Sequence, residues 1–472
     1  MLIVAAGLFL LAARPVTDPD LWWHLRTGEL IIQNHRLFHS DPYSFTRGGQ
    51  PWIDHEWLSQ ILIFALYKTA GWGGLIVGFA ALIACTFLLV LVRCSGQPYI
   101  AGAMTVWGAI ASVPSFGVRP QMVTLLLACI FLFILERSYE RPKLIWWLLP
   151  LMLLWVNVHA GYAVGLGLVA VFVLGDLLDR ALGNFPPEQW PHRVRNLTLV
   201  GLACAAIVPL NPYGVAMYRY PIETLRSRAM LAYIGEWASP DFHEARYAAV
   251  LLLMLAVILL PALSSHRLRA RELLLLSVSL YAALGSVRHI PIFVLVAAPL
   301  LSSMIEGLHG AEKLCALGPQ TRLTHINLAL NVVLLAGFLA FSGFRIQHVI
   351  RHQPEATAKE FPTAAFSFVA GARLPALIMN HYNWGGYFIW RLYPEYKVYI
   401  DGRADVYGDS FMDQFASTYY VRGEKWRAGL EKWDVQTIVL PPDAPLITAL
   451  SIEPGWKQVF SDSQAVVLTR SR

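Results

Sequence analysis

Residues 73–93 have the sequence GGLIVGFAALIACTFLLVLVR, and no charged side chain interrupts it before Arg93. A helix that crosses the hydrocarbon core of a bilayer needs about 20 consecutive, mostly apolar residues. This stretch therefore predicts a membrane span. Similar stretches recur along most of the chain, at 2–16, 99–114, 120–136, 143–158, 161–178, 196–210, 247–263, 272–287, 290–305 and 325–344. The sequence thus predicts a polytopic α-helical membrane protein of about eleven spans.

The composition agrees with this architecture. Hydrophobic residues make up 56% of the 472 residues and charged residues only 14%, whereas soluble domains carry about 25% charged residues. Such a chain must cover its apolar surface with lipid, so we expect the lipid bilayer as a partner. The formal net charge is +6, but the basic residues lie in short loops. The sequence shows no basic patch on a soluble fold, so we expect no binding of nucleic acid.

The distribution of the basic residues predicts the orientation of the spans. Lysine and arginine gather in the loops at 137–143, 180–195 and 267–271, whereas the short turns on the opposite side carry only Arg119 and Arg288. Cytoplasmic loops of membrane proteins are enriched in basic residues. We therefore expect a protein of the cytoplasmic (inner) membrane, with its N-terminus inside and its C-terminus outside.

Three regions without spans fall on the predicted outer side: a first outer loop at 17–72, a second outer loop at 211–246, and a tail from about 345. In the first outer loop, apolar residues recur at helical spacing around 21–32 and 58–65. This spacing predicts two amphipathic helices at the membrane interface. We accordingly divide the chain into a membrane domain, 1–344, and a soluble extracytoplasmic (periplasmic) domain, 345–472.

The tail has the composition of a small α/β domain. Short runs rich in β-branched and aromatic residues predict strands at 376–380, 397–400, 437–440, 456–460 and 465–469. Stretches between and beside these runs predict helices at 363–371, 409–420, 425–433 and 445–452. Such alternation of strands and helices is typical of an α/β fold.

The motif DPDLWWH at 18–24 follows the first predicted span. Two carboxylates two residues apart, Asp18 and Asp20, can share a divalent cation such as Mg or Mn, or one can act as a base whose pKa the other tunes. A helix that begins near Pro19 would place Asp20 and His24 on one face. The structural alternative is that Asp18 caps this helix, which explains one acid more easily than two.

A second motif, WIDHEWL at 52–58, opens the second amphipathic helix. His55 and Glu56 lie between tryptophans, so the motif offers proton transfer and a surface for sugar stacking together. The structural alternative is again helix-start chemistry, because acidic residues favour the N-terminus of a helix.

Further polar residues lie near the outer ends of the predicted spans: Arg119, Asn157, His159, Arg288 and His289. Taken singly, such residues are more often snorkelling or satisfied interface residues. Because they share one side with His24 and the acids, they predict a pocket with acids for catalysis and with arginine and histidine for a phosphate. The spans themselves are nearly free of ionisable groups, which disfavours a proton-coupled transporter.

A short first span, an acidic pair, two interfacial helices and a polar motif before the second span resemble the GT-C superfamily. Its members are multi-span glycosyltransferases that use sugars linked to polyprenyl phosphate. Within the superfamily, the chain resembles the bacterial branch of aminoarabinose transferases, protein mannosyltransferases and the lipopolysaccharide-core galacturonosyltransferase-like group. Asp18 and Asp20 stand at the acidic positions of that branch, and Gly28 at its glycine. Residues 51–56 stand where its Pro-Pro-Leu element lies.

The match covers about residues 1–210 in topology, and the sequence departs from the branch at two points. A proline separates the two acids, where many members have adjacent acids. His55 and Glu56 replace the usual double proline. The motifs at 155–161, 211–214, 383–387 and 399–403 look like marks of a distinct subgroup.

The resemblance implies transfer of a sugar, a hexose or a pentose, from a polyprenyl-phosphate donor to a glycan, lipid or protein acceptor. Asp18 or Asp20 would deprotonate the acceptor hydroxyl or hold a metal ion, and His55 and Glu56 would assist. The donor phosphate would be held by Arg119, Arg288 and His289. Two alternatives stay open: a transporter or flippase of lipid-linked sugars, and a non-catalytic scaffold of the cell envelope.

The tail contains two motifs of its own, NWGGY at 383–387 and YIDGR at 399–403. The structural interpretation makes Gly385-Gly386 a tight turn and the segment 401–403 an Asp–Arg turn. The functional interpretation has the tail cover the pocket and select the acceptor, with Tyr382, Trp384 and Tyr387 stacking on sugar.

Overall fold

The computed structural model describes residues 1–183, 190–308 and 325–471. The described chain packs as two compact units. The membrane unit comprises residues from 1–14, 76–218 and 235–350, and the sheet unit comprises residues from 15–75, 219–234 and the tail after 350. The first outer loop therefore packs with the tail, a grouping that the sequence did not predict.

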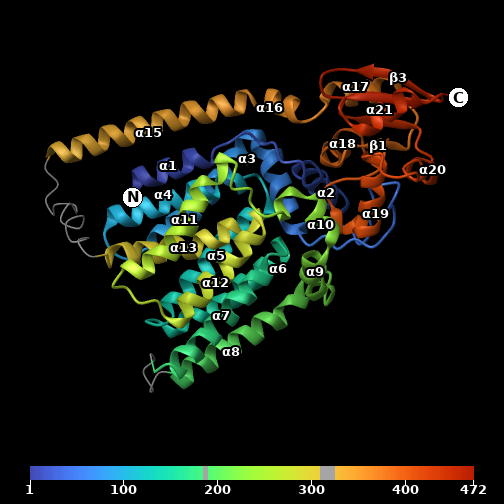
Figure 1. Cartoon of the computed structure of the whole chain (residues 1–472). Helices are drawn as coiled ribbons and strands as arrows, with labels where there is room; N and C mark the ends of the chain where they lie inside the picture. Colours follow the sequence, from blue (N-terminus) through green and yellow to red (C-terminus); the bar gives the residue numbers. More distant parts are fainter. Residues whose placement is uncertain (184–189, 309–324, 472) are drawn as a thin grey trace. The chain divides into compact units, whose positions relative to one another are not determined.

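The membrane unit is built from apolar helices. They are α1 (Leu2–Ala12), α4 (Pro98–Ser112), α5 (Pro120–Arg137), α6 (Leu148–Val158), α7 (Tyr162–Ala181), α8 (Trp190–Ile207), α11 (Ala248–Leu263), α12 (Ala270–Gly285), α13 (Ile290–Glu306) and α15 (His325–Arg351), with the second half of α3 (Trp57–Arg93). Within the unit α13 packs against α4, α11 and α12, and α7 packs against α5, α8 and α12 (Figure 1).

Each predicted span coincides with a helix. Seven described helices are long and apolar enough to cross a membrane: Trp57–Arg93, Pro120–Arg137, Tyr162–Ala181, His192–Leu210, Ala245–Leu263, Val287–Glu306 and Leu328–Arg351. The remaining predicted spans correspond to the shorter helices α1, α4, α6 and α12, of 11, 15, 11 and 16 residues. The prediction of a polytopic α-helical membrane protein is confirmed, and the orientation stays a prediction.

The two predicted amphipathic helices are α2 (Leu21–Asn34) and the first half of α3. Gly71 interrupts α3 with φ 58° and ψ −150°, a conformation that glycine adopts without a Cβ penalty. The helices approach each other so closely that a Cβ atom on Gly28 would lie 2.2 Å from the Gln60 carbonyl oxygen. Helix packing thus requires the glycine that the resemblance singled out.

The sheet unit contains a four-stranded sheet in the order β1-β2-β4-β3. Strands β1 (Ile378–Asn380) and β2 (Thr437–Leu440) are parallel, and β4 (Val466–Arg470) pairs antiparallel with both β2 and β3 (Trp456–Ser461). The described α-helices of the unit are α2, the first half of α3, α10 (Arg228–Tyr233), α16 (Gln353–Glu360), α17 (Thr363–Ala372), α18 (Gly385–Leu392), α19 (Ala404–Tyr419), α20 (Ala428–Lys432) and α21 (Pro445–Ser451), with most of α9 (Ala216–Arg226) (Figure 1). The predicted C-terminal α/β domain is confirmed.

Two predictions within the tail are wrong. Residues 397–400 form only isolated β-bridges, from Val398 to Ser44 and to Ile378. Beside them the Asn380 side chain binds the backbone: it accepts from the Tyr399 N–H at 3.0 Å and donates to the Ile400 carbonyl at 2.7 Å. Gly385 and Gly386 form no tight turn but begin α18. They are needed for close packing, because a Cβ atom on Gly385 would lie 2.3 Å from the Ile400 carbonyl oxygen.

Candidate functional site

The acid pair lies in the turn that leads into α2. The backbone N–H of Asp20 donates to Asp18 Oδ1 at 2.8 Å, and the indole N–H of Trp23 donates to Asp20 Oδ1 at 3.2 Å. Asp18 thus closes the turn that precedes α2. This contact agrees in part with the structural alternative, in which Asp18 caps the helix. Asp20 and His24 lie one helical turn apart as predicted, with the His24 N–H bonded to the Asp20 carbonyl at 3.2 Å. Both carboxylates are half-buried.

Two glycines of the tail bring its backbone directly onto the acid motif. A Cβ atom on Gly402 would lie 1.8 Å from Asp20 Oδ1, and a Cβ atom on Gly386 would lie 2.3 Å from the Pro19 carbonyl oxygen. No side chain fits at either position without displacing one of the two segments. The motifs NWGGY and YIDGR, which are distant in sequence from the acids, therefore form part of their surroundings.

Replacing Gly386 with alanine is expected to lower the stability of the sheet unit by about 1–3 kcal/mol, because the added methyl group meets backbone atoms rather than a flexible side chain. The measurement is the thermal unfolding temperature of the full-length protein. Gly371→Ala is the matched control, since Gly371 lies exposed in α17 and a Cβ atom there would meet nothing within 4 Å. An equal melting temperature for Gly386→Ala and Gly371→Ala would contradict the close approach.

Glu56 lies between two imidazole rings. Its Oε2 is 3.5 Å from His24 Nε2, and its Oε1 is 3.4 Å from His55 Nε2. Burial is the main influence on His24 and lowers its pKa to about 4, against the opposing charge of Glu56. Burial also opposes the charge of His55, but the nearby carboxylates, Glu56 first, raise its pKa above the ordinary value. One carboxylate therefore joins two imidazole rings whose pKa values are shifted in opposite directions, that of His24 downward and that of His55 upward.

Two further carboxyl groups belong to this network, and neither is predicted from the sequence as a site residue. Burial raises the pKa of Asp54 to about 7, although His55 and Gln60 favour its charged form. Burial also raises the pKa of Asp405 in α19, against the pull of His55. The Gln60 amide donates to Asp54 Oδ1 at 2.5 Å. Acids with raised pKa values beside a histidine are typical of proton-transfer sites, and the only local signal was the position of Asp54 directly before His55.

Arg403 fixes the first outer loop to the tail. Its guanidinium forms a two-point pair with Asp401 at 2.8 and 2.7 Å and reaches Asp41 Oδ1 at 2.8 Å. The rings of Tyr43 and Trp52 lie 4.9 and 4.7 Å from its central carbon. Arg403, Asp401 and Asp41 are all buried. This arrangement supports the structural interpretation of the segment 401–403.

Trp384 and Tyr387 do not offer a surface for a sugar. They are only 8% and 4% exposed. The Tyr387 ring stacks on Phe361 with centroids 5.1 Å apart and meets Trp22 edge-on at 4.7 Å. The prediction that these two rings stack on sugar is therefore corrected: both side chains are buried, and the Tyr387 ring is covered by aromatic side chains of the sheet unit.

The membrane unit gathers the predicted phosphate-binding residues around Glu236 and Trp237. Arg119 forms an ion pair with Glu236, and the Arg288 guanidinium lies 5.2 Å from the Trp237 ring. The His289 ring also meets Trp237, with centroids 6.0 Å apart. Burial opposes the charge of Glu236, but Arg119 and Arg288 hold its pKa below the ordinary value. One carboxylate thus faces two guanidinium groups, which leaves a net positive charge in this cluster.

Asn157 and His159 lie at the C-terminal end of α6. The Asn157 amide donates to the Leu153 carbonyl at 2.9 Å. His159 Nδ1 accepts the backbone N–H of Gly161 at 2.9 Å and contacts the Thr124 hydroxyl at 2.8 Å. These contacts are those of helix-end residues, and a role in substrate binding stays a prediction.

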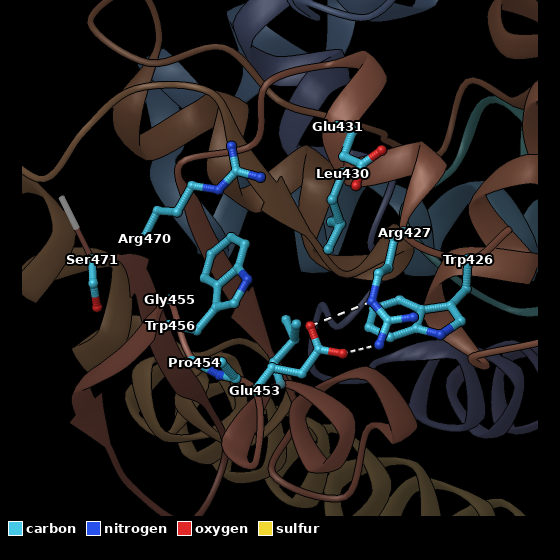
Figure 2. Close-up of a pocket in the computed structure, with 11 residues that line it drawn as sticks. Trp426, Arg427, Leu430, Glu431, Glu453, Pro454, Gly455, Trp456, Arg470 and Ser471 are labelled. Carbon is cyan, nitrogen blue, oxygen red and sulfur yellow. Dashed lines mark hydrogen bonds and ion pairs between the residues drawn. The ribbon is translucent and has the colours of Figure 1, made fainter. Parts of the chain in front are cut away.

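A pocket of about 230 Å³ opens on the sheet unit among α20, α21, β3 and β4. Figure 2 shows Trp456 and Arg470 on one side of it and the ion pair of Arg427 with Glu453 on the other. The residues that line this pocket include none of the predicted site residues. The pocket is therefore separate from the acid motif.

Comparison with known proteins gives matches in structure rather than in sequence. No protein-family model matches the sequence, and no curated protein matches it. One similar structure is the archaeal oligosaccharyltransferase AglB from Archaeoglobus fulgidus, in complex with an inhibitory peptide and a dolichol-phosphate. The match covers 93% of this chain and 68% of the AglB chain, with a TM-score of 0.55 and 12% sequence identity. Another is ArnT from Cupriavidus metallidurans, bound to undecaprenyl phosphate. The match covers 98% of this chain and 96% of the ArnT chain, with a TM-score of 0.50 and 12% sequence identity. Both are GT-C proteins. The chain has the GT-C fold.

The GT-C fold confirms what the resemblance of the acid motif and the first outer loop implied about architecture. It extends well beyond residues 1–210, because the structural matches cover nearly the whole chain. The roles of individual residues in this GT-C-fold protein do not follow from a likeness at 12% identity.

Proposed function

We propose that this GT-C-fold protein is a membrane glycosyltransferase that moves a sugar from a polyprenyl-phosphate donor to an acceptor at the outer face of the cytoplasmic membrane. The two matched structures hold a dolichol-phosphate and an undecaprenyl phosphate, both polyprenyl phosphates. The observation that carries the proposal is the way in which the Asp20 carboxylate is held. The Trp23 indole N–H donates a hydrogen bond to Asp20 Oδ1, and the backbone of Gly402 packs closely against the same oxygen. A carboxylate held in this way is preorganised, as catalytic groups need to be.

In the proposed reaction, Asp18 or Asp20 takes the proton of the acceptor hydroxyl while the hydroxyl oxygen attacks the anomeric carbon of the donor sugar. The bond between that carbon and the donor phosphate oxygen breaks, and polyprenyl phosphate leaves with the electron pair. A single displacement of this kind inverts the anomeric configuration. Glu56 and His55 assist by relaying the proton, for which a carboxylate in contact with an imidazole is suited.

The positive cluster of the membrane unit is proposed to hold the phosphate. Guanidinium groups bind phosphate oxygens with two parallel hydrogen bonds, and Arg119 and Arg288 outnumber the single Glu236. The negative charge on the phosphate grows as the sugar leaves, so cations placed beside it lower the barrier. His289 is proposed as a further hydrogen-bond donor in this cluster.

Asp18 and Asp20 also fit a divalent cation such as Mg or Mn, because carboxylate oxygens are the ligands that these ions prefer. Two acids two residues apart in one turn, one of them fixed by Trp23, form a suitable pair. A bound ion would supply positive charge for the donor phosphate. The proton transfer described above depends on the carboxylates themselves.

The test of the proposed function uses the full-length protein in detergent with a polyprenyl-phosphate donor that carries a radiolabelled sugar. Fractions of envelope glycan, lipid and protein serve as acceptors. We expect the label to leave the donor and appear covalently in one acceptor fraction, with an equal amount of polyprenyl phosphate released. In detergent there are no two membrane leaflets between which a lipid could be moved. A flippase would therefore leave every labelled donor molecule chemically intact in this assay. Binding of the donor without any transfer would contradict the proposal.

A further inference from the structure

Two segments outside the first outer loop supply neighbours for His55. The imidazole ring lies against the ring of Tyr220 in α9, with centroids 4.2 Å apart and planes inclined by 35°. Asp405, in the first turn of α19, adds a carboxyl group to the electrostatic surroundings of the same imidazole. Nothing in the sequence near His55 indicates either neighbour.

Asp409 holds the segment that carries Tyr220. Its carboxylate accepts from the Ser227 hydroxyl at 2.5 Å and from the backbone N–H groups of Arg228 and Ala229 at 3.0 and 3.3 Å. These donors form the first turn of α10, where a negative charge is favoured by the exposed N–H groups. Three bonds to one carboxylate therefore fix the chain directly after α9.

A second bond holds the other end of α10. The Tyr233 hydroxyl donates to Asp413 Oδ1 at 2.9 Å. Asp409 and Asp413 are four residues apart and share one face of α19. The short helix α10 is thus tied to α19 at both ends, which restricts the movement of α9 and of Tyr220 on it.

Gly408 separates the two parts of α19. Its φ of 71° and ψ of 164° interrupt the helix between Asp405 and Asp409, a conformation that is strained for residues with a Cβ atom. Because of this break, Asp405 and Asp409 lie on different faces of α19. Asp405 faces His55, whereas Asp409 faces α10. A regular helix would place these two acids on the same face, since they are four residues apart.

We propose that Asp409 is a latch that positions His55, because it ties α10 to α19 and thereby keeps the Tyr220 ring against the imidazole. Tyr220 and Asp409 are positioning residues in this account. Its importance for transfer rests on the proposed function, whereas the placement of the imidazole does not.

Within the described sheet unit, the titratable groups near His55 include Glu56 and Asp54 beside it in sequence, His24 of α2, Tyr220 of α9 and Asp405 of α19. The latch residue is not among them. Loss of the latch is therefore expected to change the pH response of His55 indirectly, by moving the ring relative to these groups.

The test measures the reaction of His55 with diethyl pyrocarbonate, followed by mass spectrometry of the full-length protein over about pH 5–8, where imidazoles titrate. We expect Asp409→Ala and Tyr220→Ala to speed the modification of His55 several-fold and to shift its pH profile. Tyr220→Phe keeps the ring and should behave as the wild type. Glu223→Gln is the control on the same helix, because Glu223 pairs with the exposed Arg219.

An unchanged rate and pH profile of His55 in both alanine variants, with wild-type melting temperatures, would overturn the latch. If Asp409→Ala does not fold, the comparison of Tyr220→Ala with Tyr220→Phe decides the question alone. The assay contains no donor sugar. A failure of the latch therefore leaves the glycosyltransferase proposal untouched, and absence of transfer activity leaves the latch untouched.

Discussion

Replacing Asp18 and Asp20 together with asparagine is expected to reduce sugar transfer by about 10²- to 10⁴-fold, the usual contribution of a catalytic acid or base. The amide cannot accept the acceptor proton at neutral pH. Its oxygen can still accept the two hydrogen bonds now made by Asp18 Oδ1 and Asp20 Oδ1, so we expect the fold to survive. The measurement is the initial rate of label transfer from the polyprenyl-phosphate donor.

The matched control for this double variant is Asp434→Asn, because Asp434 is exposed and pairs with Arg470 away from the acid motif. It should transfer sugar at the wild-type rate. Single variants then show which of the two acids is the base, since the base should account for most of the loss. A double variant that keeps the wild-type rate would remove both acids from the mechanism.

Replacing Arg403 with methionine is expected to destabilise the protein by about 3–5 kcal/mol, the cost of breaking a buried ion pair by removal of one partner. Arg403 is the cation that Asp401 and Asp41 share, and all three are buried. Without it, two buried carboxylates face each other with the hydroxyl groups of Ser44 and Tyr407 as their remaining side-chain donors. The melting temperature of the full-length protein measures the effect.

The matched control is Arg427→Met, because Arg427 pairs with Glu453 (Figure 2) and its own side chain is half exposed, and ion pairs at the surface contribute at most about 1 kcal/mol. Adding Asp41→Asn to Arg403→Met should recover part of the loss, since it removes one uncompensated charge. Equal melting temperatures for Arg403→Met and Arg427→Met would contradict the role of Arg403 as the link between loop and tail.

The membrane architecture could be predicted from the sequence because a span is a local property. The stretch at 73–93 needs no knowledge of any other residue to be recognised as apolar and long enough. The helical spacing at 21–32 is local as well, and it predicted α2. The strand predicted at 397–400 is reduced to bridges at Val398 for the opposite reason: the Asn380 side chain, about twenty positions earlier, binds the backbone of Tyr399 and Ile400.

The site shows the same limit. Asp18, Asp20, His55 and Glu56 were recognisable because their chemistry is concentrated in two short motifs. The contact of Gly402 with Asp20 and the bond of Arg403 to Asp41 join residues more than 350 positions apart, and no local pattern indicates such pairs. Trp384 and Tyr387 were misassigned because an aromatic residue beside glycine has the same local sequence whether its ring packs in a core or lies exposed.

The most direct test of the account is a density map of the protein with a bound polyprenyl phosphate. We predict density for the lipid phosphate next to the carboxylates at positions 18 and 20, with room for an acceptor hydroxyl on the far side. Clear density for the phosphate at another place, with both carboxylates enclosed by protein, would contradict the claim that these acids perform the transfer.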